Sequence, residues 1–203
     1  MGVPVLILGE SGSGKSFSLR NLDPNSTAIF NVTSKLLPFR TKFPNTINNS
    51  TYPLIKQNLK ENKFKTYVID DSQYLMAFEL FEKAKISGYG KFTDIAVNFK
   101  DLIATIMKDT SDDTIVYLMH HTEETASGKT KIKTVGKMLD DQLTIEGLFT
   151  IVLNTKVANG QYKFVTQSDG STPCKSPVEM FDLEIDNDLK LVDDKIREYY
   201  DMK

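Results

Sequence analysis

An eight-residue segment near the start of the chain has the residue types and spacing of a phosphate-binding loop. Gly9 to Ser16 is GESGSGKS, which matches the pattern G-x-x-x-x-G-K-[ST]. The pattern is informative between a strand and a helix, and here the apolar run Val3 to Leu8 precedes it while Lys15 to Asn21 has helical composition. In such a loop, backbone N–H groups surround the β-phosphate, the lysine meets the β- and γ-phosphate oxygens, and the serine hydroxyl binds Mg²⁺. The segment predicts a site for ATP and Mg²⁺.

Two adjacent acids are expected to complete this site. The strand TYVID ends in Asp70, which we expect to bind Mg²⁺ together with Ser16. Asp71 follows, and we interpret it as a general base for the attacking water, although it could instead cap the helix beginning at Ser72. The residues expected to contact the nucleotide are those of the loop and the one after it: Gly9, Glu10, Ser11, Gly12, Ser13, Gly14, Lys15, Ser16 and Phe17.

A histidine pair follows a further apolar strand, Thr114 to Met119. A polar group at the tip of a strand can reach the γ-phosphate or the attacking water. We therefore expect His120 to sense the γ-phosphate, with His121 as the second choice. The alternative is a pair of solvated loop histidines.

These residues must be positioned by alternating strands and helices, which favours one α/β domain over residues 1–203. We divide it into a nucleotide-binding core (1–148), a hairpin and finger segment (149–180) and a C-terminal tail helix (181–203). Besides the strands above, Thr27 to Asn31 is predicted as a strand, and Asn159-Gly160 as the turn of a β-hairpin. The predicted helices are Leu54 to Glu61, Ser72 to Lys85, Asp94 to Lys108 with Thr93 or Asp94 as its cap, and Val192 to Tyr200.

Composition excludes several classes of protein. The formal net charge is −2 and no run of 18 apolar residues exists, which argues against a membrane span and a globally basic nucleic-acid binder. One cysteine, Cys174, and two histidines provide neither an internal disulfide nor a zinc cluster. The apolar start lacks a basic leader and a small-residue cleavage site, so we expect a cytoplasmic protein.

Four segments together resemble the small phage-encoded RecA-like ATPases of the single-strand annealing and recombination (Sak) group. They are GESGSGKS, YVIDDSQ, YLMHH and the lysine-rich loop ending in VGKML, and the resemblance spans about residues 3–180. It implies a mainly parallel sheet with helices on both faces and core strand order 5-1-4-3-2. It also implies ATP-dependent action on single-stranded DNA in phage recombination or replication, inside a bacterial host. A single-strand-binding protein and further copies of the chain are the implied partners. The resemblance also implies that Lys15, Ser16, Asp70 and His120 have the roles of the matching nucleotide-site residues in the family.

The lysine loop is the candidate DNA contact. In RecA-like ATPases the loop after the sensor strand binds single-stranded DNA, and flexible lysines suit phosphate contacts that read no sequence. Tyr89 and Phe92 could stack on bases or pack beneath the loop. Lys175 could reach the γ-phosphate of a neighbouring subunit as a finger residue. The loop lysines are Lys129, Lys131, Lys133 and Lys137, and the alternative for them is an ordinary solvated surface.

Three other classes of protein could contain the same loop sequence. A nucleotide kinase usually needs an arginine-rich lid, and the three arginines, Arg20, Arg40 and Arg197, argue against it. An ABC-type transport ATPase needs an LSGGQ-like signature, which is missing. The second hypothesis is a nucleotide-gated loader or scaffold for a replication partner, with slow hydrolysis and a binding surface on the hairpin and the C-terminal helix.

Overall fold

A mixed β-sheet forms the centre of the molecule. The computed structural model describes residues 1–202, without the side chains of residues 137, 138 and 140. Within these residues the sheet has nine strands and is mostly parallel. Its order is β3 (Thr46–Asn48), β2 (Thr27–Asn31), β4 (Thr66–Asp70), β5 (Ile115–Glu124), β1 (Val3–Gly9), β7 (Ile151–Ala158), β8 (Gln161–Val165) and β9 (Glu184–Asp186), with β6 (Thr130–Ile132) paired to β5.

The strand order brings the predicted site together. Apart from the short edge strand β3, the parallel strands run β7-β1-β5-β4-β2, which in chain order is the predicted 5-1-4-3-2. Parallel neighbours end at the same edge of a sheet. Gly9 is in register with His121, and Asp70 with Asn31. The loop over residues 9–16, the Asp70–Asp71 pair and the histidine pair therefore meet at one edge.

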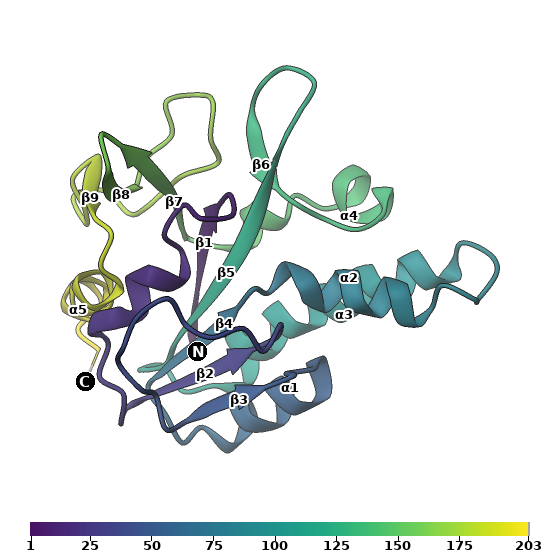
Figure 1. Ribbon diagram of the computed structural model, residues 1–203, viewed down its shortest axis with the longest axis horizontal. Helices are drawn as coiled ribbons and strands as arrows, with labels where there is room; N and C mark the ends of the chain where they lie inside the picture. The colour runs from purple at the N-terminus through teal and green to yellow at the C-terminus, as the bar shows by residue number, and fades with distance from the viewer. Residues whose placement is uncertain (203) are drawn as a thin grey trace.

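Helices cover both faces of the sheet (Figure 1). The first face packs against α1 (Tyr52–Glu61), α2 (Gln73–Glu82) and α3 (Gly90–Asp109), and the second against η1 (Ser16–Asn21) and α5 (Leu189–Tyr199). Two short helices, α4 (Lys137–Gln142) and η2 (Ile145–Leu148), lie between β6 and β7. Because side chains alternate along a strand, Leu6 and Leu8 belong to the first core and Val5 and Ile7 to the second.

Several element boundaries differ from the prediction. The helix predicted from Asp94 begins at Gly90 with Tyr89 at its N-cap position, so Thr93 and Asp94 lie within the helix and neither caps it. The Asp94 carboxylate pairs with Lys83 at 3.0 Å. The segment after the loop forms a short 3₁₀ helix, η1. Strand β5 continues through both histidines, because residues 122–124 pair with β6.

The C-terminal hairpin is confirmed. Strands β7 and β8 are antiparallel around Asn159 and Gly160, whose φ values of 52° and 73° suit a type I′ turn. Strand β9 extends the sheet beyond the hairpin. None of the described helices has the length and apolar character required to cross a membrane.

Candidate functional site

A cavity of about 420 Å³ lies at the edge of the sheet where the predicted residues meet. It is open on one side, and its walls come from the loop after β1, the end of β4, the middle of β5, the segment after β2 and strand β8. The lining residues are Ser11, Gly12, Gly14, Lys15, Ser16, Phe17, Lys35, Leu36, Pro38, Asp70, Asp71, His121 and Tyr162. The structure thus gathers most of the predicted nucleotide contacts into one pocket.

The loop is held in a curled shape by its own contacts. Lys15 Nζ donates to the carbonyl oxygens of Gly9 and Glu10 at 2.8 and 2.7 Å. Ser13 Oγ donates to the Glu10 carbonyl at 2.7 Å and lies 2.6 Å from Thr155 Oγ1 of β7. Burial lowers the pKa of Lys15 to about 8, although nearby carboxylates oppose this shift. Near pH 7 the ammonium is still mostly charged, as a phosphate contact requires.

Gly14 is a position where the loop needs glycine. Its φ is +98°, a conformation that side chains disfavour, and a Cβ atom there would lie 2.7 Å from the Tyr162 ring. Strand β8 therefore approaches the loop closely at this residue.

Ser16 and Asp70 form the candidate metal site. Ser16 Oγ donates to Asp70 Oδ1 at 2.8 Å. Burial, together with the adjacent Asp71 charge, raises the pKa of Asp70 to about 6. A hydroxyl and a carboxylate are hard oxygen ligands suited to Mg²⁺, which usually keeps several waters and binds substrate phosphates with only one or two carboxylates. The described residues contain no cluster of three histidine, cysteine or acidic groups able to hold a metal ion on its own.

Asp71 faces the pocket rather than the helix that follows it. Its φ of +60° turns the carboxylate toward Thr33 Oγ1, at 2.7 Å, and Lys35 Nζ, at 3.0 Å. His121 Nε2 lies 3.6 Å from its Oδ1. Burial acts to raise the pKa of Asp71, but these three contacts outweigh it and lower the pKa below its ordinary value. The alternative in which Asp71 caps α2 is not observed, because the carboxylate makes these contacts instead.

The two histidines point to opposite faces of β5. His120 is fully buried, with Nδ1 2.8 Å from Ser72 Oγ and Nε2 2.9 Å from the Lys133 carbonyl oxygen. His121 lines the pocket, and its Nε2 has no hydrogen-bond partner among the described residues. The expectation for His120 is therefore corrected: the structure places His121 beside Asp71 and His120 in the core, because neighbouring strand residues alternate between faces.

Burial of His120 predicts a pH dependence of folding. Burial lowers the pKa of His120 to about 3. Between that value and about 6.5, the unfolded chain binds a proton that the folded chain does not, so stability decreases as the pH falls. We expect wild type to lose about 2 kcal/mol more than His120→Asn between pH 7 and pH 5 in urea unfolding. Equal slopes for wild type and His120→Asn would contradict the prediction.

Four lining residues lie outside the sequence prediction, and two of them, Lys35 and Tyr162, bear on the chemistry of the site. Lys35 follows β2, and its Nζ bonds Asp71 and lies 5.1 Å from the centroid of the Tyr74 ring. Its position just beyond a parallel strand was a usable signal, because such strands end at the site edge. Tyr162 comes from β8, and nothing local in the sequence places it beside Gly14.

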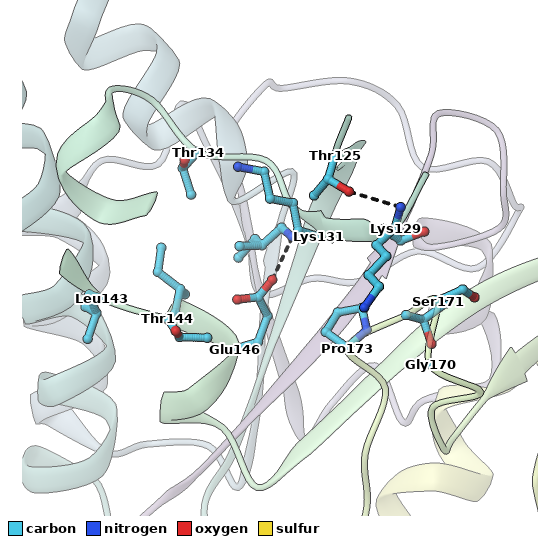
Figure 2. A pocket seen from close by; sticks show the side chains of 14 residues that line it. Thr125, Lys129, Lys131, Thr134, Leu143, Thr144, Glu146, Gly170, Ser171 and Pro173 are labelled. Atoms are coloured by element: carbon cyan, nitrogen blue, oxygen red, sulfur yellow. Dashed lines mark hydrogen bonds between the residues drawn. The ribbon is translucent and has the colours of Figure 1, made fainter. Parts of the chain in front are cut away.

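The lysine loop forms a β-hairpin with mixed charge. Lys131 pairs with Glu123 across β5 and β6 at 2.9 Å, whereas Lys129 and Lys133 are exposed. Beside the hairpin lies a cavity of about 410 Å³ (Figure 2), whose wall includes Lys129, Lys131 and the buried Glu146. The Glu146 carboxylate accepts a hydrogen bond from the backbone of β6 at 2.8 Å. The cavity is therefore not lined by cations alone.

The remaining predicted contacts whose side chains the structure describes lie outside the pocket. The side chain of Lys137 falls outside the described part of the structure. The Lys175 backbone pairs with Val152 of β7, and its side chain does not line the pocket. Tyr89 is exposed, whereas the ring of Phe92 packs against Gly136 just before α4.

Comparison with models of known protein families gave no match, and comparison with curated proteins gave none either.

Proposed function

We propose that this chain binds ATP with Mg²⁺ and hydrolyses the phosphoanhydride bond to the γ-phosphate, which releases ADP and inorganic phosphate. The observation that carries the proposal is the hydrogen bond between Ser16 of the phosphate-binding loop and Asp70 at the end of β4, beside the ammonium of Lys15. A loop lysine, a hydroxyl and a carboxylate at the ends of two parallel strands, β1 and β4, on either side of β5, form the group of side chains that a Mg²⁺–triphosphate requires.

Each side chain has a defined task in this proposal. Lys15 exchanges its bonds to the Gly9 and Glu10 carbonyls for phosphate oxygens, and Ser16 and Asp70 hold Mg²⁺, which neutralises phosphate charge when bound. Lys35 adds a second cation near the γ-phosphate.

We assign Asp71 and His121 to orienting the attacking water, because both side chains line the pocket and His121 Nε2 lies 3.6 Å from Asp71 Oδ1. Because the pKa of Asp71 is lowered, this carboxylate stays ionised near neutral pH, and we assign it mainly to polarising and aligning the water.

We further propose that the ATPase is RecA-like and acts on single-stranded DNA in phage recombination or replication, in cooperation with a single-strand-binding protein and with further copies of itself. Two features support this assignment: the order of the parallel strands, and the β5–β6 hairpin that carries the lysine loop directly after the two histidines. Lys133 N donates to the His121 carbonyl at 2.9 Å, while the Lys133 carbonyl contacts His120. A shift of the hairpin on DNA would therefore be transmitted to His121 and the pocket.

The test is ATP hydrolysis by the purified protein with and without short single-stranded DNA, at two salt concentrations, with Lys15→Ala as the blank. Salt-sensitive stimulation supports a DNA-dependent ATPase. ATP binding with slow hydrolysis and no stimulation favours the alternative, a nucleotide-gated loader for a replication partner. No ATP binding contradicts the proposal.

A further prediction concerns Lys129 and Lys133, the two exposed lysines of the β5–β6 hairpin. We expect Lys129→Glu with Lys133→Glu to weaken single-strand binding about tenfold or more and to reduce the slope of log affinity against log salt by about 1.4, since each lost phosphate contact removes about 0.7. Fluorescence anisotropy with a labelled oligonucleotide measures both quantities. Lys60→Glu with Lys63→Glu changes the net charge equally, near the end of α1 and away from the pocket, and should have little effect. Equal losses in the two double variants would show that only net charge matters.

A further inference from the structure

A buried amide beside the phosphate-binding loop lacks hydrogen-bond partners. Asn187 is only 2% exposed, and neither its Nδ2 nor its Oδ1 has a partner among the described residues. A buried amide without a partner is unfavourable, because nothing replaces the water that it has lost. A ligand with a matching donor and acceptor would therefore supply the hydrogen bonds that the Asn187 amide lacks.

Asn187 is held against the loop by its neighbours. A Cβ atom at Gly14 would lie 3.3 Å from Asn187 Nδ2 and 3.4 Å from its Oδ1. Arg20 Nη1 donates to the Asn187 carbonyl at 2.6 Å, and Asn187 N donates to the Tyr162 carbonyl at 3.4 Å. These contacts join η1, β8 and the connection from β9 to α5 on one side of the molecule (Figure 1).

A second cavity of about 280 Å³ opens at this place, and Asn187 is one of its lining residues. Phe17 and Tyr162 line both this cavity and the larger one that holds the loop, so the two cavities adjoin. The two rings lie 5.9 Å apart, and the guanidinium of Arg20 lies 4.2 Å from the Phe17 centroid. The wall between the cavities is thus aromatic and suits a flat ring.

The chain direction orients a nucleotide across both cavities. Phe17 directly follows Ser16, so a nucleotide whose phosphates occupy the loop can extend its sugar and base past Phe17. The second cavity is where that base would lie.

We propose that this second cavity binds the nucleotide base and that Asn187 recognises adenine. The inference rests on the proposed nucleotide site and extends it to the choice of base. An asparagine amide offers one donor face and one acceptor face, which match the exocyclic amine and an adjacent ring nitrogen of adenine. Tyr162 is 40% exposed, and its ring is the surface on which the base would pack.

The experiment compares the binding of ATP with that of purine riboside triphosphate, which has the same rings without the amine. Wild type should prefer ATP by about tenfold. Asn187→Leu should lose this preference and bind ATP about tenfold more weakly. Its melting temperature should not fall, because the substitution removes an unpaired buried amide in favour of an apolar group of similar size.

A second variant covers the case in which Asn187→Leu fails to fold. Tyr162→Ala should weaken ATP binding about tenfold through lost stacking, while binding of inorganic tripolyphosphate stays unchanged. An Asn187→Leu protein that keeps wild-type affinity and preference would overturn the role of Asn187, and equal binding of GTP and ATP by wild type would overturn the choice of adenine.

Tripolyphosphate also separates the two proposals. If tripolyphosphate binds to wild type but not to Lys15→Ala, and nucleotides with different bases bind with equal affinity, the base site is rejected and the phosphate site stands. If neither tripolyphosphate nor ATP binds, the proposed function itself fails.

Discussion

Lys15→Ala is expected to weaken ATP binding by about 100-fold or more, because charge-assisted bonds to the phosphate oxygens are lost from a buried site. Lys15 is the cation of the loop itself, and its ammonium donates hydrogen bonds to two loop carbonyls. Titration with a fluorescent ATP analogue, in the presence of Mg²⁺, measures the change.

Lys100→Ala is the matched control for this variant. Lys100 is an exposed residue of α3 paired with Asp101, so its loss removes the same charge away from the pocket. The control should bind ATP as wild type does. If Lys15→Ala retained wild-type affinity, the loop would not be the phosphate site.

Asp71→Asn is expected to leave ATP affinity within about threefold and to slow single-turnover hydrolysis about 100-fold, because the carboxylate that we propose to orient the water loses its charge. In the structure this carboxylate is the shared partner of Thr33 and Lys35 and lies beside His121. Rapid-quench measurement of phosphate release, with binding determined separately, tests both halves of the prediction. Unchanged hydrolysis would remove Asp71 from the chemistry.

Lys35→Met tells whether Asp71 acts directly or through its partner. If Lys35→Met hydrolyses ATP normally while Asp71→Asn is slow, Asp71 acts on the water itself. If both variants, and the double variant, slow the reaction to the same extent, the two residues act as one unit.

Much of the site was predictable because its signals are local. The spacing from Gly9 to Ser16, the apolar strand before it and the acid at the end of Thr66 to Asp70 are visible without any long-range contact. The hairpin at Asn159-Gly160 was predictable for the same reason, since few residue pairs favour positive φ at two consecutive positions.

Register and packing decided the rest. The choice between His120 and His121 depends on which face of β5 each residue occupies, and an apolar run buried on both faces does not reveal that. Lys35 lines the first cavity because the segment after β2 lies beside the loop. Asn187 lines the second cavity because the connection from β9 to α5 passes next to the same loop. Local spacing therefore determined which chemistry the chain can carry, and tertiary contacts between segments far apart in sequence determined which side chains surround it.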